Sequence, residues 1–285
     1  MYLLIILNQF IASFTHIIAK DITSYTEPAL VLLYRSFVAS ACFIIYLLFL
    51  RKNKIPFDKK DLPVLIILSL LNIPINQFLF VESVKLTSAP NVSLAYSLSP
   101  AFVLILSYFL LKEKLTAKKV IGIVIALAGT AVVFSKSDIS LSSKSFQGDI
   151  LALCASISWA LYIVLGKNFT TKYGAIYATS LTMTLGTVFF VIVYFFSGHS
   201  FAYPNFSCVD WSKIVYLGFF TSVLNYVIGY YALTKIEATK LSIFNNLQPV
   251  LTTVFAILIF SYSLSVEFVI GSIGIIGGVF LTQRG

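Results

Sequence analysis

The stretch 91-NVSLAYSLSP-100 has a counterpart 149 residues later, 240-KLSIFNNLQP-249. Both stretches end at a proline inside a long apolar run, and both carry polar residues just before it. The same offset also pairs Asn76 with Asn225. Matches among Leu, Ile and Val arise easily by chance in apolar sequence, whereas a register that pairs Asn and a mid-run Pro does not. The sequence therefore predicts an internal repeat.

The repeat extends beyond these stretches at the same offset. Val-Ile-Gly at 120–122 pairs with Val-Ile-Gly at 269–271, and Gly129 pairs with Gly278. Small residues spaced along apolar helices allow their backbones to approach closely. The glycines of these two segments therefore predict close helix packing.

The composition identifies the solvent in which the chain folds. Of its 285 residues 59% are apolar and 11% are charged, whereas a soluble domain carries about 25% charged residues. This balance excludes a soluble globular enzyme, a disordered chain and a disulfide scaffold. The predicted fold class is an all-α integral membrane protein.

Ten segments are long and apolar enough to span a bilayer, which takes about 20 residues of helix. They are 2–19, 28–50, 62–82, 88–111, 117–135, 148–166, 175–196, 211–232, 239–260 and 264–283. The connections between them are too short to hold a soluble domain. We therefore expect ten transmembrane helices, with the lipid bilayer and a small-molecule substrate as partners.

Basic residues collect on one side of these spans. Fourteen fall on one side: Arg51, Lys52, Lys54, Lys59, Lys60, Lys112, Lys114, Lys118, Lys119, Lys167, Lys172, Lys235, Lys240 and Arg284. The other side has five: Lys20, Lys85, Lys136, Lys144 and Lys213. Because basic loops stay in the cytoplasm, we expect both termini to be cytoplasmic, in a bacterial inner (plasma) membrane. The bases form no extended face, so no nucleic-acid partner is predicted.

Each half of the repeat holds five spans. Since five is odd, the second half enters the membrane from the opposite side, giving two inverted five-helix repeats. We expect a first repeat at 1–135, an external linker at 136–147 and a second repeat at 148–285. Inverted repeats of transporters place a binding site near the bilayer midplane, and one half rocks against the other to expose it to each side in turn.

Several motifs carry a resemblance to a known family. They are the Ser99-Pro100 and Gln248-Pro249 steps, the Leu-Lys-Glu-Lys-Leu turn at 111–115 and Trp-Ala-Leu-Tyr at 159–162. With the two five-span halves, they resemble the EamA-type branch of the drug/metabolite transporter superfamily over essentially the whole chain. The resemblance implies EamA-like repeats and export or exchange of small metabolites such as amino acids.

Polar side chains within the spans mark surfaces that face protein or water, because they are costly in hydrocarbon. Ser242, Asn245, Asn246 and Pro249 fall on one helical face. We predict a substrate chamber formed by Asn76, Gln77, Tyr96, Trp159, Tyr162, Asn225, Tyr226, Asn245, Asn246 and Gln248. The alternative is that these amides and hydroxyls join neighbouring helices, which stabilises them by roughly 0.6–2 kcal/mol each.

Three ionisable residues complete the candidate pathway. His16 shares a helical face with Gln9, and Arg35 lies about 10 Å inside its span at 1.5 Å per residue. Arg35 either holds a carboxylate or phosphate of the substrate or pairs with Glu82, which we expect at a similar depth. No Asp or Glu lies near the middle of a span, which disfavours proton antiport.

The leading function is a secondary transporter, an exporter or exchanger, of small organic metabolites, with amino acids or similar amphipathic solutes as substrates. One alternative is a carrier of phosphorylated or nucleotide-linked metabolites, and a further one is an intramembrane lipid-handling protein. We predict no enzyme: no catalytic dyad, cofactor loop or metal motif is present in the sequence. The sequence leaves open a monomer or a homodimer.

Overall fold

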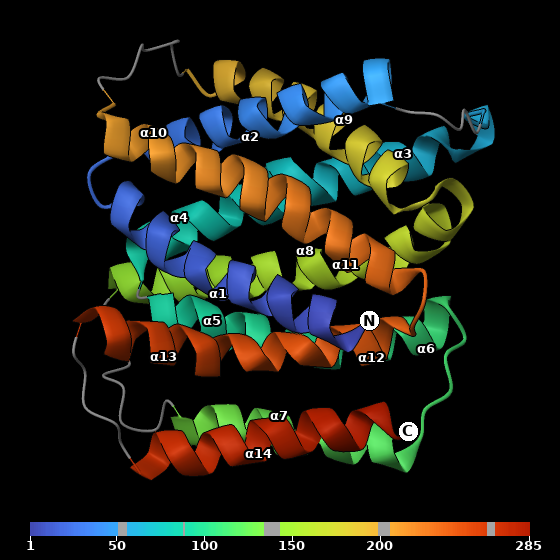
Figure 1. The fold of residues 1–285 in the computed structure, drawn as a ribbon, viewed down its shortest axis with the longest axis vertical. Helices are drawn as coiled ribbons and strands as arrows, with labels where there is room; N and C mark the ends of the chain where they lie inside the picture. The colour runs from blue at the N-terminus through green and yellow to red at the C-terminus, as the bar shows by residue number, and fades with distance from the viewer. Residues whose placement is uncertain (51–55, 88, 134–142, 199–205, 261–265) are drawn as a thin grey trace.

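The computed structural model describes residues 1–50, 56–87, 89–133, 143–198, 206–260 and 266–285, which contain helices and no strand (Figure 1). The expected linker residues 136–142 and the bases Arg51, Lys52, Lys54 and Lys136 lie outside these ranges. The α-helices are α1 (Tyr2–Thr23), α2 (Pro28–Ile45), α3 (Leu62–Leu70), α4 (Phe78–Leu86), α5 (Ala89–Ser97), α6 (Ser99–Leu110), α7 (Ala117–Val133), α8 (Ser143–Tyr173), α9 (Ala175–Phe196), α10 (Cys208–Val215), α11 (Tyr226–Leu233), α12 (Ala238–Ser242), α13 (Leu247–Phe260) and α14 (Val266–Gln283). Shorter π or 3-10 segments are η1 (Tyr46–Leu50), η2 (Lys59–Asp61), η3 (Leu71–Gln77), η4 (Tyr216–Asn225) and η5 (Ile243–Asn246).

Seven helical segments of the described chain are long and apolar enough to cross a membrane. They are Tyr2–Thr23, Pro28–Phe49, Lys59–Leu86, Asn91–Leu110, Lys144–Tyr173, Ala175–Phe196 and Cys208–Leu233. The described parts of the expected spans at 117–135, 239–260 and 264–283 are helical as well: α7 and α14 are shorter, and α12, η5 and α13 form an interrupted run. Large apolar side chains such as Phe49, Phe109 and Phe196 are exposed on the outside of the bundle, where lipid would cover them. The protein is an integral, multi-pass membrane protein.

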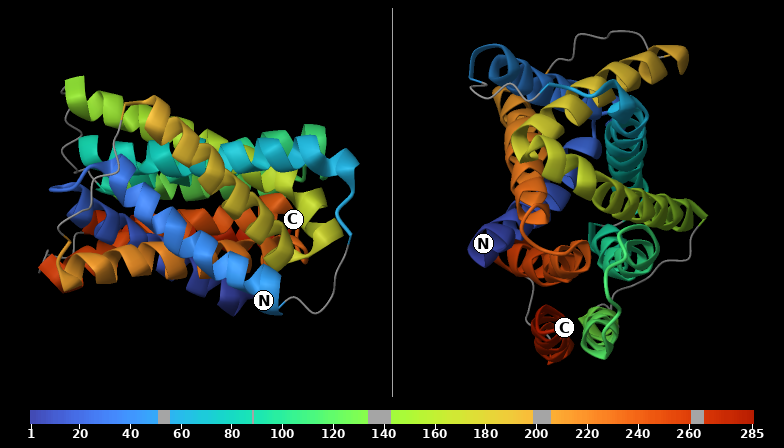
Figure 2. Two further views of the ribbon diagram at one scale, coloured as in Figure 1. Left: turned by 90° about the horizontal axis from the view of Figure 1, so that it is seen from above. Right: turned by 90° about the vertical axis from the view of Figure 1, so that its right-hand side faces the viewer.

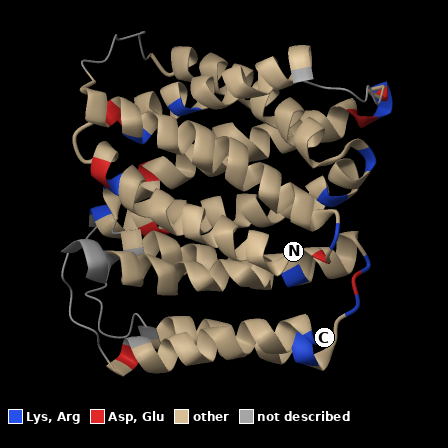
Figure 3. Ribbon diagram, in the orientation of Figure 1, with Lys and Arg blue, Asp and Glu red and all other residues tan. Residues whose placement is uncertain are grey.

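The helices run between the two ends of the bundle, some along its length and others tilted across it (Figure 2). The two termini lie at the same end of the bundle, where the Tyr2 hydroxyl donates to Gln283 Oε1 at 3.5 Å. We call this the terminal end and the opposite one the distal end. Figure 3 shows the charged residues concentrated toward the two ends and sparse between them.

Helices α7 and α14 form a pair at one edge of the molecule (Figure 1). Glycines make their close contact possible: a Cβ on Gly122 would lie 2.7 Å from the main-chain oxygen of Gly278, and one on Gly129 would lie 2.7 Å from that of Gly271. Real Cβ atoms do not approach so closely. The prediction that these glycines serve packing is confirmed.

The helices around the centre are irregular at equivalent places in the two halves. Asn76 and Asn225 each lie in a π-helical segment, η3 and η4, in which one residue is added to the helical turn. The spans with Pro100 and Pro249 are both interrupted just before the proline: one residue, Leu98, separates α5 from α6, and η5 separates α12 from α13. These segments present polar backbone and side chains to the centre of the bundle.

Helix α8 is longer than expected. It begins at Ser143, within the stretch expected to be a linker, and ends at Tyr173 rather than near residue 166. No Pro interrupts this stretch, so nothing in the sequence stops the helix earlier. It ends before Gly174, whose φ of +82° suits glycine and turns the chain directly into α9.

Candidate functional site

A cavity lies between the two halves of the chain and encloses about 550 Å³ of empty space, including the part at its mouth. Residues of α1, α2, α4, α5, α8, α11 and α13 and of the segments η3, η4 and η5 line it. The lining consists of Asn8, Ala12, Thr15, His16, Arg35, Asn76, Gln77, Phe80, Tyr96, Trp159, Thr221, Asn225, Tyr226, Asn245 and Gln248.

Most of the residues predicted for the substrate chamber lie around this cavity. These are Asn76, Gln77, Tyr96, Trp159, Asn225, Tyr226, Asn245 and Gln248, and the pathway candidates His16 and Arg35 join them. Tyr162, Asn246 and Glu82 do not belong to the lining. The sequence did not point to Asn8, Ala12, Thr15, Phe80 or Thr221, which complete it.

Asn76 is held in place by hydrogen bonds on both sides of its amide. Its Nδ2 donates to the Tyr96 hydroxyl at 2.9 Å and to the main-chain oxygen of Ala155 at 2.8 Å. The Tyr226 hydroxyl donates to its Oδ1 at 3.4 Å. Asn76 therefore connects η3 with α5, α8 and α11, and its amide is fully used within the protein.

Asn225 occupies the repeat-equivalent position but is bonded differently. Its main-chain oxygen, which the π-helical segment leaves available, accepts a hydrogen bond from Asn8 Nδ2 at 2.6 Å. Its side-chain Oδ1 is buried and has no hydrogen-bond partner in the structure. This oxygen is available to a ligand in the cavity.

Aromatic rings form one wall of the cavity. Trp159 stacks on Tyr162 with ring centroids 5.8 Å apart and meets Tyr226 edge to face at 5.4 Å. Tyr162 lies behind this wall, fully buried, and stacks on Tyr230 at 5.0 Å. Its hydroxyl is shared with Thr182 at 3.2 Å. Tyr162 therefore supports the wall, and Trp159 supplies its surface.

The amides of Asn245 and Gln248, just before Pro249, line the cavity and also join helices. Asn245 Nδ2 donates to Ser99 Oγ at 2.8 Å, and Gln248 Nε2 donates to Gln9 Oε1 at 2.9 Å. Both bonds link the second half of the chain to the first. Asn246 is fully buried outside the lining, and neither polar atom of its side chain has a partner among the described residues.

A smaller cavity lies next to the first on the side of the terminal end. Asn8, Trp159, Tyr226 and Asn245 line both cavities, and Leu233 and Leu241 line the smaller one. These four shared residues therefore form a partition between the two spaces. The larger space lies on the distal side of the partition, because Arg35 and Phe80 lie in the distal halves of the spans Pro28–Phe49 and Lys59–Leu86.

Arg35 is the positively charged residue of the lining. It is 2% exposed, and its Nε donates to Ser222 Oγ at 2.8 Å. Its Nη1 is buried without a partner, and no ion pair joins it to a carboxylate in the described part of the chain. The considered ion pair with Glu82 is therefore not formed, because the guanidinium turns to η4.

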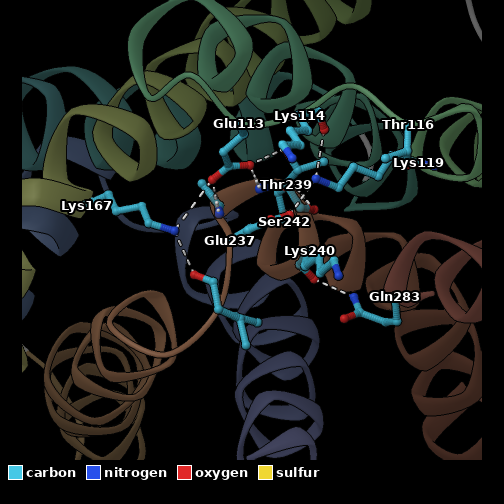
Figure 4. A network of polar contacts seen from close by, with 12 residues as sticks. Glu113, Lys114, Thr116, Lys119, Lys167, Glu237, Thr239, Lys240, Ser242 and Gln283 are labelled. Carbon is cyan, nitrogen blue, oxygen red and sulfur yellow. Dashed lines mark hydrogen bonds and ion pairs between the residues drawn. The ribbon is translucent and has the colours of Figure 1, made fainter. Parts of the chain in front are cut away.

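Polar contacts hold the terminal end together, as Figure 4 shows. Glu113 accepts hydrogen bonds from the main-chain nitrogens of Ala238 and Thr239 at 2.8 and 3.3 Å and from Thr239 Oγ1 at 2.8 Å. Lys167 Nζ lies 3.5 Å from Glu113 Oε1 and donates to the main-chain oxygen of Ile236 at 2.8 Å. We call these residues the terminal-end cluster. They tie the turn between α6 and α7 of the first half to α8 and α12 of the second.

A related group lies at the distal end. Lys20 Nζ donates to the main-chain oxygens of Val84 and Thr87, both at 2.8 Å. Asp149 Oδ1 accepts from Thr87 Oγ1 at 2.7 Å and from Asn91 Nδ2 at 3.1 Å. We call this the distal-end cluster. Among the described residues no group of three or more His, Cys, Asp or Glu gathers as metal ligands would.

A family model for the EamA-like transporter family matches residues 1–135 and 146–284. The chain belongs to this family. An uncharacterized transporter of Bacillus subtilis (strain 168), YyaM, is 32% identical over 94% of this chain and 88% of its own length. An uncharacterized transporter of Archaeoglobus fulgidus is 30% identical over 99% and 96%. The family and these relatives identify this EamA-like protein as a membrane transporter.

A solved crystal structure shares the fold of this EamA-like transporter. The two superpose with a TM-score of 0.75 at 18% sequence identity, over 97% of this chain and 94% of the other. At this identity the likeness concerns the fold.

Proposed function

We propose that this EamA-like protein is a secondary transporter, an exporter or exchanger, of small organic metabolites, with amino acids or similar amphipathic solutes as substrates. The observation that carries the proposal is the cavity between the two halves, which combines amide groups with an aromatic wall. Trp159 and Phe80 offer stacking surface to an apolar group. Asn225 and Gln77 offer side-chain oxygens without protein partners to a polar one.

We further propose that transport proceeds by alternating access, with both termini in the cytoplasm of a bacterial cell and the distal end facing outward. The larger cavity lies on the distal side of the Asn8–Trp159–Tyr226–Asn245 partition. The terminal-end cluster closes the route beyond it. On this proposal the structure corresponds to a form that is closed toward the cytoplasm, and rocking of the halves would open that side.

The test uses purified protein in liposomes preloaded with a mixture of unlabelled metabolites. External radiolabelled amino acids, organic acids and phosphorylated sugars are then assayed for accumulation by exchange. We expect accumulation of at least one amino acid or organic acid above that of empty liposomes, and its loss in the Trp159→Ala variant. Accumulation of none of these solutes, or of phosphorylated sugars alone, would contradict the proposal.

A further inference from the structure

We propose that Arg35 is the anchor for a carboxylate, so that the transported solute is an amphipathic organic acid carrying one negative charge at that end. The inference rests on the proposed transport function and names the substrate class of the same cavity. The Arg35 guanidinium is 2% exposed, lines the cavity and has no carboxylate partner in the described part of the chain.

A buried charge without a counter-charge is unfavourable by several kcal/mol, which makes such groups rare in membrane spans unless a ligand or water faces them. Ser222 meets one nitrogen of Arg35, and Nη1 is left without a partner. A carboxylate fits this need, because the planar guanidinium binds its two oxygens through parallel N–H groups. The Arg35 Nη1 group is therefore available to bind an anion.

The charge of the lining selects the kind of anion. Among the residues that line the cavity, Arg35 is the sole Lys or Arg, and no Asp or Glu is present. A monocarboxylate neutralises this single charge. A phosphate dianion would bring an uncompensated negative charge into the bundle, which is costly at low dielectric.

Two further buried atoms define the rest of the ligand. Gln77 Oε1 and Asn225 Oδ1 line the same cavity and have no hydrogen-bond partners. Both are acceptors, so they fit a hydroxyl or ammonium group that donates. Trp159 and Phe80 add apolar surface to the same lining. The complementary solute has one carboxylate, one hydrogen-bond donor and an apolar body.

The experiment measures binding in detergent with Trp159 as the reporter. The chain has two tryptophans, and Trp211 packs against Tyr34 and Phe206 outside the lining. Trp211→Phe therefore leaves Trp159 as the sole tryptophan, whose emission is excited selectively over that of the tyrosines. The probes are 3-phenylpropionate, L-phenylalanine, phenylalaninamide, phenethylamine and phenyl phosphate. We expect the two carboxylates to bind at least tenfold more tightly than the amide and the amine.

The variants Arg35→Gln and Arg35→Lys then separate anchoring from structure. Arg35→Gln should weaken carboxylate binding by about 10- to 100-fold, the loss of a charged hydrogen-bonded pair, and remove the preference over the amide. Arg35→Lys keeps the charge without the fork and should fall between the two. Without ligand, Arg35→Gln should raise the melting temperature by about 2–5 °C, because an uncompensated buried charge is removed.

Lys119→Gln is the matched control, since Lys119 is also buried but pairs with Glu237. It should lower the melting temperature and keep the preference for carboxylates. A lower melting temperature in ligand-free Arg35→Gln would assign Arg35 a structural role and overturn the proposal. So would a carboxylate preference that survives Arg35→Gln, tighter binding of phenyl phosphate, or no binding of any probe.

Failure of this inference and of the transport function are distinguishable. Exchange of a solute in liposomes that does not depend on its carboxylate or on Arg35 overturns the anchor and leaves transport standing. Absence of any exchange contradicts the transport function, whereas the melting temperatures and the binding preferences still decide the role of Arg35.

Discussion

Lys20 in the first half and Lys167 in the second make the same contact at opposite ends of the bundle. Lys20 Nζ donates to the main-chain oxygen of Thr87, and Lys167 Nζ donates to that of Ile236, both at 2.8 Å. Thr87 and Ile236 are separated by the repeat offset of 149 residues. Each lysine therefore fixes the start of the following proline-containing span, and the repeat is visible in contacts as well as in sequence.

The two ends differ in what surrounds these lysines. At the terminal end Glu113 pairs with Lys167 and accepts three hydrogen bonds from the first residues of α12. At the distal end Asp149 accepts from side chains, and Lys20 bonds main-chain oxygens without an ion pair in the described chain. The two ends thus share the lysine contact but differ in the contacts around it. The terminal end, which lies away from the larger cavity, is held by more hydrogen bonds to main chain and by an ion pair.

Removal of the Glu113 carboxylate should lower the stability of the protein more than any other change at the two ends. The Glu113→Ala variant removes the counter-charge of Lys167 and the acceptor of two main-chain N–H groups. We expect the free energy of unfolding to fall by about 2–4 kcal/mol. Thermal melting of the purified variant measures this.

The matched control is Asp21→Ala at the distal end, where the exposed Asp21 carboxylate pairs with the partly buried Lys213. Exposed pairs contribute less than about 1 kcal/mol, so this variant should melt close to the unmodified protein. Equal losses of stability in Glu113→Ala and Asp21→Ala would contradict a tighter closure at the terminal end.

The repeat-equivalent residues Asn76 and Asn225 should also differ in what they contribute to stability at the centre of the bundle. Asn76→Ala breaks hydrogen bonds to Tyr96 and Ala155 and should lower stability by about 1–3 kcal/mol. Asn225→Ala removes a side chain whose oxygen has no protein partner, and should change stability by less than about 1 kcal/mol while reducing transport. Melting and exchange assays on the same two preparations test this. A larger stability loss in Asn225→Ala would reverse the assignment.

The smallest expected effect concerns the turn that presents Glu113. Lys112 has a φ of 56°, in the left-handed region that favours glycine. Lys112→Gly should therefore stabilise the protein by about 0.5–1 kcal/mol. Lys114→Gly, two residues later, gains no such relief and should lower stability or leave it unchanged. A destabilised Lys112→Gly variant would show that the lysine side chain outweighs the backbone strain.

The sequence predicted the helical fold well because the apolar runs and prolines act locally. It also found Asn76, Asn225 and Gln248, since the repeat gave two independent signals for polar groups at the centre. On the first helix it pointed to His16, which lines the cavity. Gln9, expected on the same helical face, meets Gln248 of α13 instead, and Asn8 joins the lining without having been expected there.

Other residues carried no signal that sequence reasoning could use. Ala12 and Phe80 line the cavity but look like any apolar residue of a span. The π-helical segments were also not expected, and the added residue in each rotates the faces that follow it. Tyr162 shares its motif with Trp159, yet it lies behind the wall because Tyr230 and Trp159 cover its two faces.

Alternating access requires the space between the halves to open to each end of the bundle in turn. Cysteine accessibility measures this opening, after replacement of Cys42, Cys154 and Cys208 by serine. Ala12→Cys probes the larger cavity and Leu241→Cys the smaller one at the terminal end. Without substrate, a membrane-impermeant thiol reagent should label Ala12→Cys from the distal side and leave Leu241→Cys unlabelled from the terminal side. An exchanging substrate should lower the first rate and raise the second. Labelling of both positions at once, or rates that substrate does not change, would contradict alternating access.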